Sequence, residues 1–199
     1  MKHKPEGTYT LNALLDSRRA LDDLINNSLS LELIEKAAKI ITNSINNGGK
    51  IFSCGNGGSM CDSMHFAEEL SGKYRDDRRG LPAVAIADPS YLSCVGNDYG
   101  YEFIFSRYIQ AHAKPGDILI AISTSGKSLN IIRAVEYANK NQIIAIVLTG
   151  KSDSPLSLLA PISICTPAGR YADRVQELHI KVIHIIIELI ERELFPENY

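Results

Sequence analysis

The chain has 199 residues, of which 45% are hydrophobic, and its net charge is −2. This length predicts one folded domain with an ample core. The 21 basic residues are offset by 23 acidic ones without a strongly basic stripe, which argues against nucleic acid as a partner. The longest apolar stretch, residues 183–190, contains His184 and Glu188 and falls far short of the ~20 residues of a membrane span. We therefore expect a protein that does not cross a membrane.

Cysteine usage and the N-terminal residues indicate the compartment. The four cysteines, Cys54, Cys61, Cys94 and Cys165, show neither C-x-x-C pairing nor the spacing of a disulfide framework. The polar start at residues 1–6 does not have the pattern of a signal peptide. Together these observations predict buried, reduced thiols and a cytoplasmic location.

Two amphipathic helices are predicted over residues 1–48. In the second, apolar residues recur at helical spacing after Ser30, and Asn-Gly-Gly at 47–49 ends the pattern. Separated by helical patterns, five short runs rich in Ile, Val and Ala follow at 50–54, 82–87, 117–122, 143–148 and 162–165. Such runs are typical of strands buried on both faces. They predict an α/β fold over 50–195, with a five-stranded parallel sheet flanked by helices on both sides.

The first candidate site follows the first predicted strand. A Gly-Asn-Gly-Gly-Ser turn at 55–59 lets the backbone approach a ligand closely, and the amides that open the next helix favour an anion. That helix carries His65 and Glu69 one turn apart on one face, about 6 Å from each other, where they can hold one metal ion or one substrate. The alternative is a simple surface hydrogen bond between the two side chains.

Three further polar loops are expected at the carboxyl ends of strands, where parallel α/β sheets bind ligands: 88–98, 123–128 and 149–152. The middle loop offers four hydroxyl side chains at the expected start of a helix, which suits a sugar phosphate. Ordinary N-capping, the alternative, needs only one of them. Lys127 stands where a P-loop has its lysine, but Ala121 replaces a required glycine. We expect a solvated lysine there, and not a nucleoside triphosphatase.

The last predicted helix holds a third cluster of polar residues. Asp173 and Gln176 have capping-box spacing, with Asp173 as the N-cap. His179 is interpreted as solvated, whereas His184 lies among isoleucines and is either a satisfied core residue or a functional one. Gln176 and His184 are separated by ~12 Å of rise and ~80° of rotation. They converge only if they lean toward each other, or else ligands come from different subunits.

Five motifs stand in order along the chain: Ser-Cys-Gly-Asn-Gly-Gly-Ser at 53–59, His-Phe-Ala-Glu-Glu-Leu at 65–70, Val-Gly-Asn-Asp at 95–98, Ile-Ser-Thr-Ser-Gly at 122–126 and Tyr-Ala-Asp-Arg-Val-Gln-Glu at 171–177. This ordered set resembles the bacterial phosphoheptose isomerases of the sugar isomerase (SIS) superfamily. The resemblance implies a single flavodoxin-like SIS domain over 1–199. It also implies a homotetramer in which the N-terminal helices pack and the active sites lie at subunit contacts.

The resemblance further implies the reaction and the residues that perform it. Sedoheptulose 7-phosphate would be converted to D-glycero-D-manno-heptose 7-phosphate through an ene-diol, the entry step to the heptose of lipopolysaccharide. Glu69 would be the general base, in contact with substrate, and His184 the general acid. One zinc ion per subunit would be bound by His65, Glu69, Gln176 and His184. The phosphate would lie on Ser123, Thr124, Ser125 and Ser128. The sugar would contact Asn56, Gly57, Gly58, Asn97, Asp98 and Gln176.

The chain departs from the family's pattern at Met60, where a His is expected, at Lys73, where an Arg is expected, and at 167–170. None of these is a predicted acid, base or metal ligand, so they concern substrate contacts. Two non-catalytic alternatives are a paralogue that associates with the replication initiator and a sugar-phosphate sensor of the kind found in transcriptional regulators. The presence of Glu69 and His184 argues against the first, and the plain helices of the first 48 residues argue against the second.

Overall fold

The computed structural model describes residues 7–199. The prediction that residues 1–6 are not a signal peptide concerns a segment outside the described residues. Among the helices of the described range, none is both long enough and apolar enough to cross a membrane.

The centre of the molecule is a sheet of five parallel strands in the order β2-β1-β3-β4-β5. The strands are β1 (Ile51–Gly55), β2 (Ala83–Ala85), β3 (Ile118–Ser123), β4 (Ile144–Thr149) and β5 (Ile162–Cys165). All five predicted strands are therefore confirmed, together with their parallel pairing. This order is the flavodoxin-like one, in which the path of the chain across the sheet reverses between β1 and β3.

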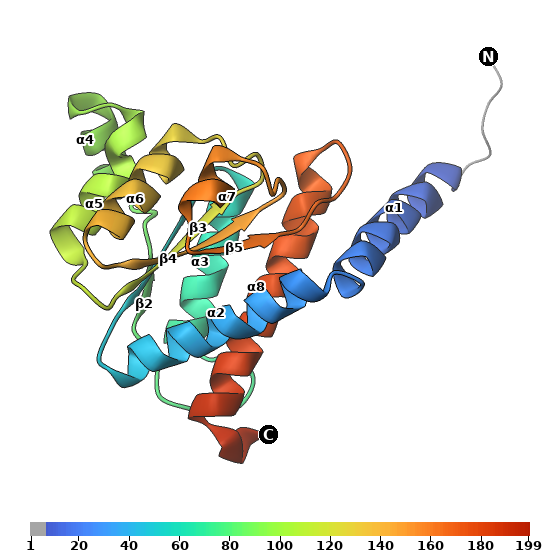
Figure 1. The fold of residues 1–199 in the computed structure, drawn as a ribbon, viewed down its shortest axis with the longest axis horizontal. Coiled ribbons are helices and arrows are strands. Elements are labelled where there is room, and N and C mark those ends of the chain that lie inside the picture. The colour runs from blue at the N-terminus through green and yellow to red at the C-terminus, as the bar shows by residue number, and fades with distance from the viewer. Residues whose placement is uncertain (1–6) are drawn as a thin grey trace.

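Helices cover both faces of the sheet (Figure 1). One layer consists of α1 (Thr8–Ile25), α2 (Ser28–Asn46), α3 (Gly58–Ser71) and α8 (Ala172–Leu194). The other consists of α4 (Pro89–Asp98), α5 (Ile104–His112), α6 (Leu129–Lys140) and α7 (Pro155–Leu159). Short 3₁₀ turns, η1 (Tyr101–Phe103) and η2 (Pro196–Asn198), complete the described chain. A hydrophobic core lies on each face of the sheet, and successive strand side chains point to opposite cores. Ile118 and Ile120 face the first layer of helices, whereas Leu119 and Ala121 face the second.

The predicted N-terminal helix pair is present in α1 and α2. The side chain of Asn27 accepts a hydrogen bond from the Ser30 amide and caps the start of α2, and Gly48, with φ of +76°, follows its end. Helix α1 projects beyond the sheet (Figure 1), and only Ala20 and Leu24 of its side chains are buried. Most of α1 is therefore exposed in the single chain.

The loop predicted at 88–98 is wrong, because the structure forms α4 there. Asp88 is its N-cap and accepts a hydrogen bond of 2.7 Å from the Tyr91 amide, and Pro89 occupies the first helical position. This pair of residues is a favourable helix start. The Gly-Asn-Asp segment at 96–98, interpreted as a loop signal, forms the last turn of α4.

Two predictions about α8 are also wrong. The helix begins at Ala172 with Tyr171 as N-cap, so Asp173 lies inside the first turn, where its carboxylate accepts from the Arg174 amide at 2.9 Å. The expected capping box is therefore not the start of this helix. His179 is not solvated but fully buried, because it faces the core on the same side of α8 as Val175 and Val182.

The prediction of buried thiols holds for one cysteine. All four cysteines are free; Cys54 is buried in β1 and Cys165 is half-buried, whereas Cys61 and Cys94 are exposed. The two exposed thiols lie on the outward faces of α3 and α4, where the periodicity of a helix places every third or fourth residue in solvent.

Candidate active site

The two most polar loops lie next to each other at the carboxyl ends of β1 and β3. These strands are neighbours, with Cys54 opposite Ala121 and Gly55 opposite Ile122. The glycine turn and the loop with the hydroxyl side chains therefore leave the sheet side by side, at the point where its strand order reverses. Ligands of open α/β sheets bind in the crevice at this point.

The glycine turn brings α8 close to the start of α3. Gly57 has φ of +56° and precedes the helix, a conformation that favours glycine. A Cβ atom on Gly58 would lie 2.6 Å from Nε2 of Gln176. The absence of a Cβ atom at Gly58 therefore leaves room for the Gln176 side chain against the N-terminus of α3.

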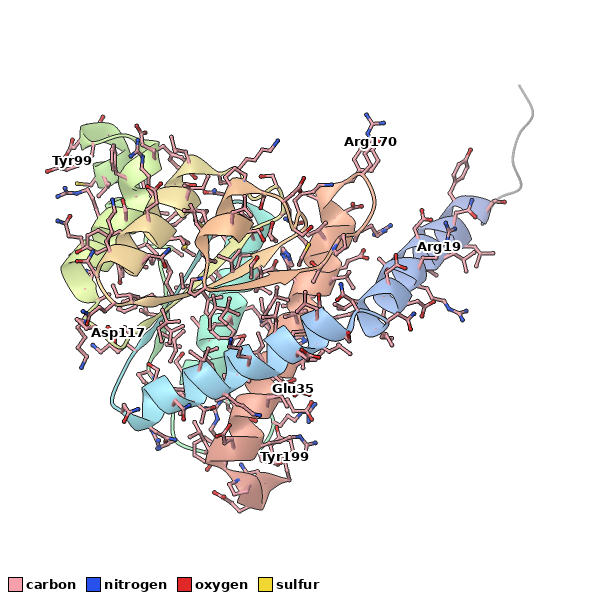
Figure 2. The ribbon with its side chains drawn as sticks, viewed as in Figure 1. Arg19, Glu35, Tyr99, Asp117, Arg170 and Tyr199 are labelled. Atoms are coloured by element: carbon pink, nitrogen blue, oxygen red, sulfur yellow. The ribbon has the colours of Figure 1, made fainter. Side chains whose placement is uncertain are left out.

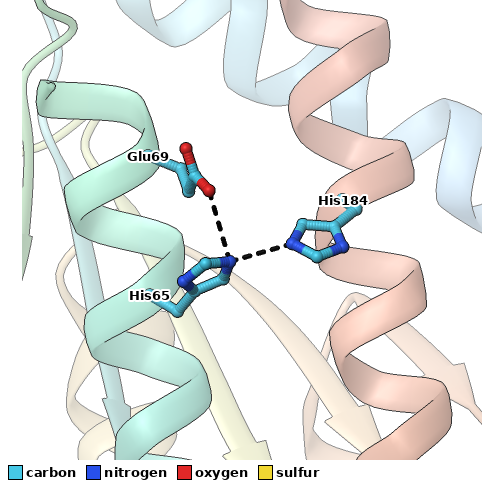
Figure 3. A group of neighbouring side chains, drawn as sticks. All are labelled: His65, Glu69 and His184. Atoms are coloured by element: carbon cyan, nitrogen blue, oxygen red, sulfur yellow. Dashed lines mark hydrogen bonds and ion pairs between the residues drawn. The ribbon is translucent and has the colours of Figure 1, made fainter. Parts of the chain in front are cut away.

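Three side chains from α3 and α8 form what we call the imidazole–carboxylate cluster: His65, Glu69 and His184 (Figure 3). Nε2 of His65 lies 3.4 Å from Oε1 of Glu69 and 2.8 Å from Nε2 of His184. The sequence-predicted pairing of His65 with Glu69 on one helix face is thus present, and α8 adds His184 to it within the same chain. His184 is half-buried and not part of the core, which argues against the core-histidine alternative.

Glu68 and Tyr74, neither of which was predicted from the sequence, support the cluster. Nδ1 of His65 lies 3.1 Å from a carboxylate oxygen of Glu68. A proton on Nδ1 would be held by this carboxylate, which leaves the Nε2 lone pair facing the cluster. The Tyr74 hydroxyl donates to the His184 carbonyl oxygen at 3.4 Å. The spacing of three residues between His65 and Glu68 was the available sequence signal.

The environment shifts the pKa values of the two proposed proton-transfer groups in opposite directions. Burial raises the pKa of Glu69, the neighbouring Glu68 carboxylate raises it further, and His65 opposes the shift. Burial lowers the pKa of His184, and repulsion from His65 acts in the same direction. A carboxylate whose pKa is raised toward neutrality is a more effective general base near pH 7, whereas His184 is favoured as the neutral imidazole.

The cluster has the donor set of a metal site. One ligand atom each from His65, Glu69 and His184 all lie within 4.8 Å of one another. Zinc accepts imidazole nitrogen and carboxylate oxygen at about 2.0–2.2 Å, so these atoms are close enough to share one ion. Three protein ligands and an open position are typical of catalytic zinc sites. Gln176, the fourth predicted ligand, lies eight residues earlier on α8, where it lines the neighbouring cavity.

A buried arginine fixes the end of α3 behind the cluster. Arg78 donates to the carbonyl oxygens of Glu69 at 2.7 Å and Leu70 at 3.0 Å. Its Nε atom donates to Glu191 at 2.6 Å, and both side chains of this ion pair are 1% exposed. The Tyr199 hydroxyl donates to the second oxygen of Glu191 at 3.0 Å. The backbone that carries Glu69 is therefore tied to the C-terminal part of α8, through contacts that no local pattern predicts.

A cavity of about 120 Å³, here called the hydroxyl cavity, lies between the glycine turn and the loop after β3. Its lining consists of Asn56, Ser59, Ile122, Ser123, Thr124, Ser125, Ser128 and Gln176. The four hydroxyl residues predicted to bind phosphate are thus brought together, with Gln176 opposite them. Gly57, Gly58, Asn97 and Asp98 are not in this lining.

The hydroxyl cavity is not explained by helix capping. Ser128 occupies the N-cap position of α6, but its side chain accepts no hydrogen bond from the first turn within the described chain. The Ser128 hydroxyl instead lies 3.2 Å from that of Ser123, which accepts from the Gly126 amide at 3.2 Å. Small hydroxyl donors beside a helix N-terminus suit a phosphate group. Lys127 is exposed, as expected for a solvated lysine.

The remaining predicted sugar contacts differ in how they are held. Asn56 and Asn130 exchange two side-chain hydrogen bonds of 2.9 Å, and the Tyr101 hydroxyl donates to Asn56 at 3.1 Å. Asn97 and Asp98 are exposed at the end of α4 and bond to each other at 2.8 Å. Asn56 is therefore fixed in the lining of the hydroxyl cavity, whereas Asn97 and Asp98 are exposed to solvent at the end of α4.

Comparison with known proteins agrees with this site. The SIS domain family matches residues 17–150. The phosphoheptose isomerase of Glaesserella parasuis is 55% identical over 181 residues, which is 91% of this chain and 94% of that protein. The phosphoheptose isomerase of Vibrio cholerae is 51% identical over 91% of this chain and 95% of its own length.

Solved structures give the same result. The phosphoheptose isomerase GmhA of Neisseria gonorrhoeae superimposes with a TM-score of 0.85 at 35% identity, covering 92% of this chain and 97% of its own. A phosphoheptose isomerase of Francisella tularensis superimposes with a TM-score of 0.88 at 31% identity, covering 95% of this chain and all of its own. The flavodoxin-like SIS fold implied by the motifs is thus confirmed. The chain belongs to the SIS domain family and, within it, to the phosphoheptose isomerases.

Proposed function

We propose that this protein converts sedoheptulose 7-phosphate to D-glycero-D-manno-heptose 7-phosphate, as an aldose–ketose isomerase at the entry to the heptose of lipopolysaccharide. The observation that supports it most directly is the imidazole–carboxylate cluster beside the hydroxyl cavity. One part carries groups that move protons, and the other carries neutral donors for a phosphate. The non-catalytic alternatives require no such cluster.

The reaction moves one proton between carbons and one between oxygens. Glu69 removes a proton from C1 of the ketose, next to the C2 carbonyl, and later delivers it to C2. The neutral imidazole of His184 donates its N–H proton to the C2 oxygen as Glu69 removes the C1 proton, and in the second transfer the C1 hydroxyl returns a proton to His184 as Glu69 delivers its proton to C2. An ene-diol lies between the two transfers. The raised pKa of Glu69 and the lowered pKa of His184 support this division of roles.

Substrate recognition is assigned to the loops around the hydroxyl cavity. The phosphate lies on the hydroxyls of Ser123, Thr124, Ser125 and Ser128, at the N-terminus of α6. The sugar contacts Asn56, Gly57, Gly58, Asn97, Asp98 and Gln176. The exposed Asn97 and Asp98 would exchange their mutual hydrogen bond for contacts with a bound sugar, whereas Asn56 is already fixed by Asn130.

We also propose that zinc is held by His65, Glu69 and His184, and that Gln176 becomes the fourth ligand when its side chain leans from the hydroxyl cavity toward His184. When bound, zinc would polarise the carbonyl and stabilise negative charge on its oxygen. Because metal binding makes a carboxylate a weaker base, the two roles of Glu69 oppose each other. Dialysis against a chelator should remove activity, zinc should restore it, and the fold should survive. Elemental analysis of the active protein tests the zinc proposal. Fully active enzyme without stoichiometric metal would refute the zinc site, while the proposed isomerase activity would stand.

A cytoplasmic homotetramer completes the proposal. Free cysteines, two of them exposed, suit a reducing compartment. Large apolar side chains on the projecting α1 are exposed in the single chain, including Leu11 at 57%, Leu14 at 65% and Ile25 at 57%. Burial of this helix against other copies would remove them from water. Light scattering on the purified protein measures the mass, and a monomer would contradict this arrangement.

The test of the reaction is direct. Purified protein is incubated with sedoheptulose 7-phosphate, and formation of the aldose 7-phosphate is followed by chromatography. We expect conversion that depends on protein concentration and is absent from a Glu69→Gln preparation of the same purity. No conversion by a folded, zinc-loaded protein would refute the proposed function.

A further inference from the structure

A second pocket lies on the other side of the sheet from the imidazole–carboxylate cluster. This pocket, about 390 Å³ in volume and here called the α5–α6 pocket, is formed mainly by α5, α6 and the segment after α4. These helices belong to the layer that does not contain α3 and α8 (Figure 1). Its size is within the range of about 300–1,000 Å³ found for small-molecule sites.

The pocket contains two arginines that lack an acidic partner. In the described chain, neither Arg107 nor Arg133 has a carboxylate within ion-pair distance, whereas Arg78, Arg174 and Arg192 each have one. The Nε atom of Arg133 is buried and has no hydrogen-bond partner there. A buried donor of this kind has lost its water without gaining an acceptor, which is unfavourable. Both arginines line the pocket, where an anionic ligand would supply acceptors for their guanidinium groups.

An aromatic ring packs against each of the two guanidinium groups. The Arg107 guanidinium carbon lies 3.7 Å from the centroid of the Tyr99 ring, and that of Arg133 lies 4.6 Å from the centroid of Phe103. Stacking of this kind restricts the side chains while leaving the edge of the guanidinium free to donate. The flat faces of the rings and guanidinium planes also accept a planar ring by stacking.

The charge of the pocket defines the anion. Arg107, Arg133 and Lys140 face a single carboxylate, that of Glu136, which leaves a net charge of +2 in the lining. A phosphate monoester carries about −1.5 to −2 at pH 7. We propose that the α5–α6 pocket is a binding site for a phosphate monoester that carries a planar ring, such as a nucleoside monophosphate. The phosphate lies on the two arginines, and the ring stacks at the aromatic wall.

Calorimetric titration of the full-length protein with AMP tests the site, with adenosine and inorganic phosphate as separate probes. AMP should bind more tightly than either part alone. Arg107→Gln and Arg133→Gln should each weaken AMP at least ~10-fold, because each removes a charge-assisted hydrogen bond. Arg18→Gln, on an exposed position of α1, should change nothing. Figure 2 shows Tyr99 and Arg19, the neighbour of Arg18, at opposite ends of the molecule.

Two further variants keep the test sharp. Glu136→Gln removes the only carboxylate of the lining and should tighten AMP, an effect that loss of folding would not produce. The double change Ser123→Ala and Ser125→Ala separates this pocket from the hydroxyl cavity, so AMP affinity should persist in it. No binding of AMP to the wild type, or AMP affinity that survives both arginine changes, would overturn the proposal. Affinity lost in the serine variant alone would place AMP in the hydroxyl cavity and equally overturn it.

Discussion

The imidazole–carboxylate cluster and the hydroxyl cavity differ in how their groups are held and in what they can do. The cluster side chains come from the faces of α3 and α8, and Glu68, Tyr74 and Arg78 support them from behind. The hydroxyls come from one loop and bond mainly to each other and to loop amides. Under the proposed function, the charge that changes during the reaction falls on rigid helices, and the fixed charge of the phosphate meets neutral donors. Changes in the cluster should therefore act on kcat, and changes in the cavity on KM.

The largest expected effect is that of Glu69→Gln. It keeps the side-chain volume and removes the base, so kcat should fall by ~10²–10⁴ while KM changes little. Steady-state kinetics with the 7-phosphate substrate measures both constants. Glu32→Gln, at an exposed position of α2, is the matched control and should leave kcat unchanged. Near-normal turnover in Glu69→Gln would show that Glu69 is not the general base.

The next effect concerns the cavity. Replacing Ser123 and Ser125 together by Ala should raise KM and weaken competition by inorganic phosphate, by ~1–3 kcal/mol, as expected for lost hydrogen bonds to a charged group. Turnover at saturating substrate should fall less than affinity does. Ser152→Ala, at an exposed position after β4, is the control and should be silent. Equal affinities in the wild type and the double variant would contradict phosphate binding at this loop.

The next prediction concerns the stability of α8, the helix that contributes to both the imidazole–carboxylate cluster and the hydroxyl cavity, through its buried residue His179. Burial lowers its pKa from the ordinary value of 6.5 to about 4, with the Thr149 backbone opposing the shift. The folded state therefore keeps His179 neutral, while the unfolded chain takes up a proton as the pH falls below 6.5. Between pH 7.5 and 5 this linkage should remove ~2 kcal/mol of unfolding free energy.

Urea unfolding of wild type and His179→Leu at the two pH values measures this contribution. The variant should lose less stability on acidification, because it has no group to protonate at this position. The same loss in both proteins would show that acid destabilises the molecule elsewhere. Phosphate affinity and turnover near pH 7.5 should be nearly unchanged if α8 keeps its position.

The smallest effect is expected at Tyr199, which supports the cluster from a distance. Tyr199→Phe removes one hydrogen bond to the buried Glu191 and should lower the unfolding free energy by ~1 kcal/mol. Thermal unfolding measures the change, with the exposed Tyr171→Phe as control. A decrease in kcat that corresponds to more free energy than the loss of unfolding free energy would show that the position of Glu69 depends on this contact. Identical Tm values for both variants would show that the contact contributes nothing.

Much of the fold was accessible from sequence, because buried parallel strands and amphipathic helices are local patterns. The five strands and the α1–α2 pair follow from apolar runs and spacing. The error at 88–98 arose because small polar residues are ambiguous between a loop and a helix that begins at Asp88-Pro89. The start of α8 was misplaced because a residue with capping chemistry, Asp173, lies two positions inside the helix.

The candidate site was predictable in part for the same reason. His65 and Glu69 lie four residues apart, so helical geometry alone puts them together, and Glu68 was within the same reach. The approach of His184 depends on how α8 packs against α3. Arg78 and Glu191 are 113 residues apart, and nothing in either neighbourhood predicts that they meet. The burial of His179 likewise follows from which face of α8 meets the sheet.

A single helix spans both halves of the site. Helix α8 lines the hydroxyl cavity with Gln176 and completes the cluster with His184, eight residues later, so the two ends are fixed at ~12 Å of rise. The length of this helical segment therefore sets the distance between the hydroxyl cavity and the cluster. It favours a substrate whose phosphate and reacting carbons lie at opposite ends of its chain, and a shorter sugar phosphate held at one end falls short of the other. We therefore expect selectivity for chain length to follow from the stiffness of a helix, without a dedicated contact.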